Sequence, residues 1–335
     1  MAKLKFLIAG LGSIGRRHLR NLRALGETDI LLYRSHLATL PGDELAGIPV
    51  ATDLEKALNW KPDAVIVANP TALHLDVALP AARAGCHLLL EEPVSGSLTG
   101  VDELANTAKN TGSRILVGFQ FRFHPTLKQA VEFLKGGAIG RILSVRVQWG
   151  EFLPNWHPWE DFKQGYAARP DLGGGVALTL CHPLDYLRWL MGEVNALWAF
   201  TGAQGLGLPV EDAIEIGLRF EAGAIGSVHL NYNQQPPVHC LEIVGSEGTL
   251  RWDNSDGQLQ LYRVSTKAWE KFFPPEGFER NHLFLDETRH FLAVVRGEAE
   301  PLCTLQDGKR ALELALSALS SAQKGSLISF EKDGQ

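Results

Sequence analysis

The first part of the chain alternates short apolar runs with helical patterns of polar and apolar residues. A first strand is expected over residues 4–9, and the runs at 64–68 and 88–90 contain no charged position. Strands that are apolar on both faces are typical of a parallel sheet with helices packed on each side. The chain up to about residue 120 therefore predicts βαβ units around a parallel sheet.

A different period begins near residue 140. Apolar Val145, Val147 and Trp149 alternate with polar neighbours, and residues 214–220 repeat the alternation. A period of two places one face of a strand in the core and the other toward solvent. This half predicts hairpins of a mostly antiparallel sheet. It also contains two helical apolar stripes, within residues 284–295 and 311–319.

Composition excludes several classes of protein. The 335 residues are enough for two domains of ~150 residues. With 32 Lys and Arg against 38 Asp and Glu, the net charge is −6, and no block of like charge marks a nucleic-acid surface. No apolar run reaches the ~18 residues of a membrane span. The 4 cysteines are widely spaced, so a reducing, cytoplasmic setting is expected.

A glycine pattern lies between the first predicted strand and the first predicted helix. Gly10, Gly12 and Gly15 form G-x-G-x-x-G, with Ser13 and Ile14 in the last gap. The first glycine permits a tight turn, the second lets the backbone approach a pyrophosphate, and the third allows close packing of helix on strand. We expect these five residues to bind a dinucleotide at the helix N-terminus.

The patterns and the fingerprint together define the predicted organisation. The fold class is α/β, with a Rossmann dinucleotide-binding domain over residues 1–121. An α+β domain with a large open, mostly antiparallel sheet follows over residues 122–335 and is expected to bind the substrate. Whether the C-terminal helix packs back on the first domain is left open.

The end of the second predicted strand bears on the choice of cofactor. An NAD enzyme usually carries Asp or Glu there for the ribose 2′-hydroxyl, but this chain has Tyr33, Arg34 and Ser35. A guanidinium beside a hydroxyl suits a 2′-phosphate, so NADP is preferred over NAD. The alternative is an arginine that stacks on adenine without discriminating between the two cofactors.

Further motifs follow in a recognisable order. Asn69-Pro70 with His74 precedes Glu91-Glu92-Pro93, and three glycines at 173–175 precede His182 and Asp185. With the glycine fingerprint, these motifs resemble those of the Gfo/Idh/MocA oxidoreductases over nearly the whole chain. The resemblance implies hydride transfer between nicotinamide and a carbinol carbon of a sugar, cyclitol or sugar acid. It also implies a homodimer or homotetramer formed through the antiparallel sheet.

The resemblance assigns catalytic roles to two residues. His182 is the expected acid/base, and its alternative is a histidine packed in a helix. Glu92 stands where a lysine is expected beside the nicotinamide. A lysine ammonium would stabilise an alkoxide, whereas a carboxylate stabilises an imidazolium or acts as a base. We expect Glu92 to be catalytic, and the alternative is that it marks loss of the usual chemistry.

The remaining cofactor contacts that the resemblance implies follow the later strands. They are Asn69, Pro70, His74, Glu91 and Gln120.

An aromatic and polar segment over residues 149–169 predicts a long structured loop. Aromatic faces beside polar groups suit a polyhydroxylated ring, although any one aromatic residue could instead clamp the loop to its own domain. The alternative for Arg122 is a structural salt bridge. The expected substrate-binding residues are Arg122, His124, Trp156, Tyr166, Arg169 and Asp185. No metal site is expected, because the 11 histidines include no ligand-spaced pair.

The sequence therefore predicts an NAD(P)-dependent dehydrogenase or reductase with His182 as acid/base. Two alternatives stay open. One is a redox-neutral sugar-processing enzyme that uses its dinucleotide transiently. The other is a non-catalytic dinucleotide-binding sensor, suggested by Glu92 and by Thr179 at the position of an expected aspartate. The expected partners are a small polyhydroxylated substrate and further copies of the chain, with no nucleic acid and no membrane.

Overall fold

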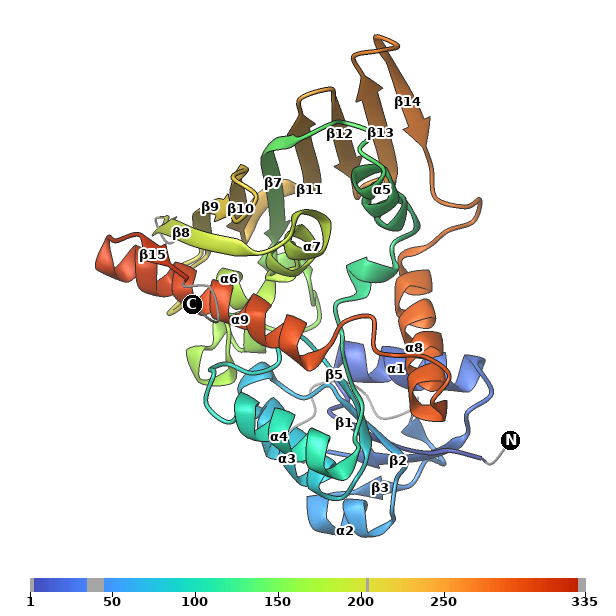
Figure 1. Ribbon diagram of the computed structural model, residues 1–335. Helices are drawn as coiled ribbons and strands as arrows, with labels where there is room; N and C mark the ends of the chain where they lie inside the picture. The colour runs from blue at the N-terminus through green and yellow to red at the C-terminus, as the bar shows by residue number, and fades with distance from the viewer. Residues whose placement is uncertain (1–2, 35–44, 203–204, 331–335) are drawn as a thin grey trace. The chain divides into compact units, whose positions relative to one another are not determined.

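The computed structural model describes residues 3–34, 45–202 and 205–330. The chain divides into two compact units, each built around its own sheet (Figure 1). The first unit contains residues 1–120, 171–173 and 279–312. The second unit contains residues 121–170, 174–278 and 313–335.

The first unit has a six-stranded sheet in the order β3-β2-β1-β4-β5-β6. Residues 6–9 and 64–67 are fully buried, because helices cover both faces of these central strands. Phe6 pairs in parallel with Ile30 on one side and with Ala64 on the other. The strands are β1 (Lys5–Ala9), β2 (Asp29–Tyr33), β3 (Val50–Ala51), β4 (Ala64–Val67), β5 (His87–Leu90) and β6 (Ile115–Val117).

Two pairs of helices cover the faces of this sheet (Figure 1). The α1 helix packs with α8, and α3 packs with α4. The predicted apolar stripe of α8 is present, but Glu287 lies buried within it between Phe284 and Phe291. The helices are α1 (Ser13–Ala24), α2 (Leu54–Asn59), η2 (Thr71–Leu73), α3 (His74–Arg83), α4 (Val101–Thr111) and α8 (Arg280–Arg296).

The second unit has a nine-stranded sheet in the order β14-β13-β12-β11-β7-β10-β9-β8-β15. Its neighbouring strands are antiparallel except for β7 and β10, which pair in parallel. The predicted alternation is present in β7, where Val145 and Val147 are buried and Arg146 is exposed. The strands are β7 (Ile142–Phe152), β8 (Val194–Thr201), β9 (Ala213–Phe220), β10 (Ile225–Asn231), β11 (Asn233–Gly245), β12 (Gly248–Asp253), β13 (Gln258–Arg263), β14 (Ala268–Phe272) and β15 (Ile328–Ser329).

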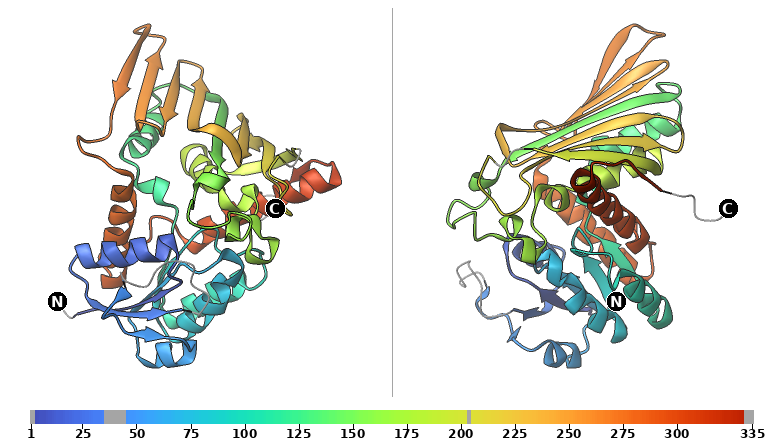
Figure 2. Two further views of the ribbon diagram at one scale, coloured as in Figure 1. Left: turned by 180° about the vertical axis from the view of Figure 1, so that it is seen from behind. Right: turned by 90° about the vertical axis from the view of Figure 1, so that its left-hand side faces the viewer.

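Helices cover one face of the nine-stranded sheet. The α5 helix contacts α7 and β13, and α6 contacts β9 and β10. Along the described chain, no helix lies over the other face (Figure 2, right). The helices are α5 (Pro125–Lys135), α6 (Val176–Thr179) and α7 (His182–Met191). Short turns of 3₁₀ helix are η3 (Gln120–Phe123), η4 (Leu153–Asn155), η5 (Tyr166–Ala168) and η6 (Pro170–Leu172).

The predicted fold class is confirmed, since a Rossmann-type parallel sheet is followed by a large, mostly antiparallel one. The compact units differ from the predicted domains mainly at residues 279–312. These residues fall within the predicted second domain, 122–335, but belong to the first unit because α8 packs on α1. The boundary between the units then falls within α9 (Leu305–Lys324). Among the described helices, none is long and apolar enough to cross a membrane.

Candidate active site

The predicted cofactor residues of the first unit lie beyond the carboxyl ends of its parallel strands. In a doubly wound sheet this edge is where ligands bind. The glycine fingerprint follows β1, Tyr33 ends β2 and Arg34 follows it, Asn69 and Pro70 follow β4, Glu91 follows β5, and Gln120 lies three residues beyond β6. Ser35 lies outside the described residues.

A side chain at any of the fingerprint glycines would disturb the turn: at Gly10 and Gly15 it would collide with the backbone, and at Gly12 it would occupy open space beside the turn. Gly10 has a φ of +90°, and a Cβ there would lie 2.4 Å from the carbonyl oxygen of Ala68. A Cβ on Gly15 would lie 1.9 Å from the carbonyl oxygen of Gly10, so the helix packs directly on the turn. Gly12 has nothing within 4 Å of its Cβ position, and α1 carries no acidic residue in its first turn. This open cradle at a helix N-terminus fits the phosphates of a dinucleotide.

His74 joins the loops that follow β4 and β5. Its Nε2 lies 2.9 Å from the carbonyl oxygen of Asn69, and its Nδ1 lies 2.9 Å from that of Pro93. Burial lowers the pKa of His74, while Glu91 and the two carbonyl groups act in the opposite direction. The imidazole therefore fixes the loop that carries Glu91 and Glu92, whose backbone includes a cis bond between Glu92 and Pro93.

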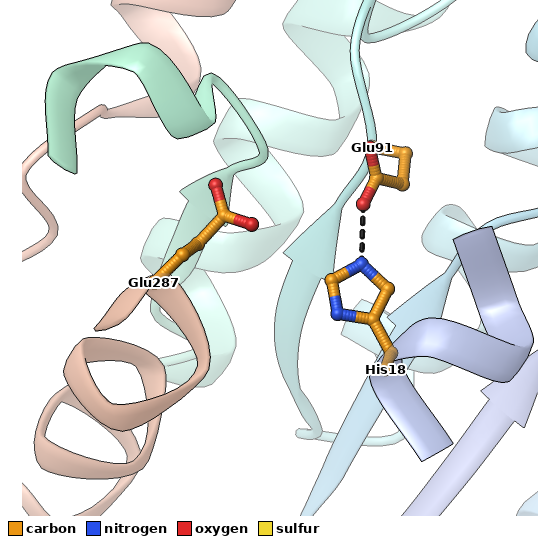
Figure 3. A group of neighbouring side chains, drawn as sticks. All are labelled: His18, Glu91 and Glu287. Carbon is orange, nitrogen blue, oxygen red and sulfur yellow. Dashed lines mark hydrogen bonds and ion pairs between the residues drawn. The ribbon is translucent and has the colours of Figure 1, made fainter. Parts of the chain in front are cut away.

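Glu91 turns into the interior of the first unit. Its carboxylate contacts Nε2 of His18, which extends from α1 and is fully buried (Figure 3). Gly118 leaves the space that this carboxylate occupies, because a Cβ there would lie 3.1 Å from a carboxylate oxygen of Glu91. The pair connects α1 to the end of β5 and holds the start of the Glu91–Pro93 turn.

Glu287 of α8 extends into the same space from a third element (Figure 3). Its side chain is fully buried, and burial together with Glu91 and Glu92 raises its pKa well above the usual range for a carboxyl group. His18 and Glu287 are not among the site residues expected from the sequence. A sequence feature that could have identified them is a polar residue on the apolar face of a helix. His18 lies beside Leu19 on α1, and Glu287 lies one turn from Phe284 on α8.

Glu92, the predicted catalytic carboxylate, is half-buried in the first unit. It faces a neighbourhood that is already acidic, since it acts electrostatically on both His74 and Glu287. Gln120, the last residue of the N-terminal segment of the first unit, is buried.

His182, the predicted acid/base, is the first residue of α7 in the second unit. Its ring centroid lies 5.1 Å from that of Phe121, edge to face, and 5.3 Å from that of Trp149. The imidazole is 5% exposed. These aromatic walls fix the orientation of the ring, as general acid/base catalysis requires.

Trp149 also stacks on a second histidine that sequence analysis did not select. The rings of Trp149 and His239 are parallel, with centroids 4.2 Å apart. Nε2 of His239 lies 3.1 Å from the hydroxyl of Tyr186. The signal that could have identified His239 is the register, because β11 places it directly opposite Trp149 on β7.

Arg122 and Asp185 form a buried ion pair in the second unit. Nε and Nη2 of Arg122 each donate to one carboxylate oxygen of Asp185, at 2.9 Å and 2.7 Å. Both side chains are almost fully buried. Each charge is therefore balanced by the other, and the pair ties the η3 turn to α7, which carries His182.

His124 belongs to a hydrogen-bonded network that joins Thr126 to Trp252 on β12 and to Gly257, which precedes β13. Oγ1 of Thr126 donates to the carbonyl oxygen of Gly257 at 2.7 Å and accepts from Nε1 of Trp252 at 3.2 Å. Because this hydroxyl has no second proton, Nδ1 of His124 must be the donor across the 3.0 Å contact between them. Burial lowers the pKa of His124 to about 4, so the ring is neutral at pH 7.

The predicted loop is present from residue 153 onward and contains η4 and η5, but residues 149–152 are the end of strand β7 and not part of a loop. Trp156 is half-buried with its ring edge-on to Tyr232 at 5.6 Å, and Tyr166 is 38% exposed. Arg169 is half-buried at the end of η5. The loop therefore offers partly open aromatic and cationic groups, whereas Arg122, His124 and Asp185 are enclosed.

Comparisons with known proteins agree with this arrangement. A family model described as an oxidoreductase family with an NAD-binding Rossmann fold matches residues 4–119. A model of the GFO/IDH/MocA C-terminal domain matches residues 127–251.

Two curated relatives are similar over most of the chain. Myo-inositol 2-dehydrogenase of Thermotoga maritima is 26% identical over 349 residues, which cover 97% of this chain and 98% of the relative. The 1,5-anhydro-D-fructose reductase of Ensifer adhaerens is 28% identical over 275 residues, which cover 80% of each protein.

Solved structures share the fold. Levoglucosan dehydrogenase in complex with NADH has a TM-score of 0.87 at 21% identity, covering 98% of this chain and 99% of that chain. The WlbA dehydrogenase from Bordetella pertussis in complex with NADH and UDP-GlcNAcA has a TM-score of 0.83 at 23% identity, covering 99% of this chain and 100% of that chain.

The neutral, buried state of His124 predicts a pH-dependent loss of stability. The unfolded chain binds a proton near the ordinary pKa of 6.5, but the folded chain does so only near 4, so stability present above pH 6.5 falls as the pH falls toward 4. The difference corresponds to about 3 kcal/mol. Urea unfolding at a series of pH values should show a loss in the wild type that is smaller by about this amount in His124→Asn. Equal pH dependence in the two proteins would contradict the assignment.

Proposed function

Because this chain belongs to the Gfo/Idh/MocA family of NAD(P)-dependent oxidoreductases, we propose that it transfers a hydride to or from the carbinol carbon of a sugar, cyclitol or sugar acid. His182 is the proposed acid/base. The observation that carries this assignment is the placement of His182, a buried imidazole held between Phe121 and Trp149 at the start of a helix.

The first unit supplies the dinucleotide-binding groups. Backbone N–H groups at the start of α1 bind the pyrophosphate, and Gly10 and Gly15 let the chain approach it closely. His74 holds the loops after β4 and β5 in place. A bound nicotinamide supplies or accepts the hydride.

The second unit supplies the proton chemistry. When the substrate is oxidised, His182 takes the hydroxyl proton as the hydride leaves the carbinol carbon, and in the reverse direction it returns this proton. The Arg122–Asp185 pair positions α7 and thereby His182. Position 92 is not a lysine, so no ammonium group there stabilises an alkoxide. The hydroxyl proton must therefore pass to His182 while the hydride leaves, before a full alkoxide charge develops. Glu92 is the second proposed catalytic residue, and it belongs to the first unit.

Two finer assignments concern specificity. Arg34 follows β2 where a 2′-phosphate would lie, and neither Tyr33 nor Arg34 is acidic, so we assign NADP as the preferred cofactor. Trp156, Tyr166 and Arg169 are the proposed substrate contacts, because the loop leaves them partly open. Arg122, His124 and Asp185 are buried in the second unit, so we assign them to holding its elements in place.

The open face of the nine-stranded sheet is the proposed contact with a second copy of the chain. Trp198 and Phe200 on β8 are 41% and 63% exposed. The same face has a groove of about 550 Å³ with arginines and carboxylates alternating along its walls, among them Arg146, Glu242 and Arg251. Exposed aromatic groups beside both signs of charge suit a self-complementary interface.

The function is tested first with the wild-type protein. Reduced-nicotinamide absorbance is followed with NADP and with NAD across inositols, aldoses, sugar acids and anhydrosugars. We expect cofactor-dependent turnover with one of these classes and a higher kcat/KM with NADP. Substrate consumption with no net change in the cofactor, or bound cofactor with no turnover on any class, would contradict the proposal.

Replacing His182 tests the proposed acid/base. His182→Asn should lower kcat by about 10²–10⁴-fold, because proton transfer loses its positioned imidazole. Binding of NADPH, measured by its fluorescence, should stay within experimental error of the wild type. Equal turnover in the variant and the wild type would remove His182 from this role.

The proposed interface predicts a change of mass. Light scattering should give a dimer or tetramer for the wild type and a smaller species for Phe200→Glu, because a carboxylate would be buried in the contact. A matched control is Leu98→Glu, whose side chain is also exposed but belongs to the first unit. A monomeric wild type would contradict the assignment.

A further inference from the structure

Three buried side chains converge in the first unit from three separate elements. His18 comes from α1, Glu91 follows β5 and Glu287 comes from α8 (Figure 3). One possible ligand atom from each lies within 4.8 Å of the other two. We propose that these three residues form a binding site for a divalent transition-metal ion such as Zn²⁺, Co²⁺ or Mn²⁺.

Unsatisfied polar atoms point to a ligand at this place. Glu287 is fully buried, and neither of its carboxylate oxygens has a hydrogen-bond partner among the described residues. Nδ1 of His18 is also buried and, within the described chain, has no partner. Buried polar groups in folded proteins are nearly always paired, and a buried carboxylate is costly unless a cation or donors compensate it. A metal ion would supply the partner that Glu287 lacks.

The donor set suits such an ion. Imidazole nitrogen and carboxylate oxygen are both ligands of zinc, and a site with three protein ligands leaves a position for a water molecule. The Glu91 side chain is 11% exposed, so this edge of the cluster reaches solvent and offers a route for the ion. To bind both side chains, the ion would replace the proton that joins His18 and Glu91, and the two donor atoms would move apart.

Charged groups around the site act on its members. Glu92 adds a third carboxylate that acts on Glu287. Arg17 is the nearby cation that acts on Glu91, and its guanidinium lies over the Phe284 ring, 4.3 Å from the centroid. No ion pair joins Arg17 to Glu91 or Glu287 in the described part of the chain. A divalent ion would therefore give the carboxyl groups of Glu91 and Glu287 a positive partner that Arg17 does not provide through an ion pair.

This site differs from the sequence-based expectation, which included no metal. The three ligands are far apart in sequence and only packing of α8 on α1 brings them together. The site also goes beyond the proposed function, since hydride transfer requires no metal. Its test needs neither substrate nor cofactor, so either assignment can fail without the other.

Metal binding is measured on the full chain after removal of metals with a chelator. Co²⁺ is titrated while its visible absorption is followed, and bound Zn²⁺ is counted by elemental analysis after dialysis. We expect about one ion per chain, with affinity weakened by more than ~100-fold in Glu287→Gln and in His18→Asn. Glu27→Gln is the matched control, because Glu27 is a mostly buried carboxylate of the same unit that is paired with Arg296.

Three results would overturn the site. The first is that the wild type takes up no more metal than Glu287→Gln does. The second is that the wild type and Glu287→Gln bind Co²⁺ with equal affinity. The third is an infrared band of a protonated carboxyl group that disappears in Glu287→Gln but persists in the wild type with excess Co²⁺, which would show that a proton satisfies Glu287. If His18→Asn fails to fold, Glu287→Gln decides, since it preserves the shape of the side chain.

Discussion

The buried contact between Glu91 and His18 is the constraint on which the candidate site depends most. It joins the end of β5 to α1, the helix whose first turn forms the dinucleotide cradle. Gly118 makes room for the carboxylate, and His74 holds the other end of the same turn through the carbonyl oxygen of Pro93. The position of Glu92 follows from these contacts, so this proposed catalytic residue lies in a turn that is held at both ends.

The second unit fixes its catalytic candidate by a different means. In the second unit, His182 is held by a cluster of aromatic rings and by the buried Arg122–Asp185 ion pair. The register of β7 and β11 places Trp149 against His239, and the Arg122–Asp185 pair connects η3 to the helix of His182. Such buried pairs are costly to break from one side, which makes them effective at holding geometry.

The period of apolar residues was sufficient to predict the two sheets, and the spacing of the glycines was sufficient to predict the turn before α1. Each of these features depends on residues that are close together in the sequence. These patterns were not sufficient to place residues 279–312. The apolar stripe of α8 shows that one face is buried but does not show that α1 is its partner. For the same reason Glu287 and His18 could not be paired from sequence, and Arg122 could not be assigned to Asp185. Each of these contacts is made only when distant segments pack together.

The proposed reaction passes a hydride between nicotinamide and a carbinol carbon of the substrate. A decisive measurement uses NADPH that carries deuterium at its transferable position, mixed with the carbonyl form of the substrate class that gives turnover. We expect one deuterium on the carbinol carbon of the product for each molecule of cofactor oxidised. Product without deuterium, or deuterium that stays on the cofactor while substrate is consumed, would contradict it.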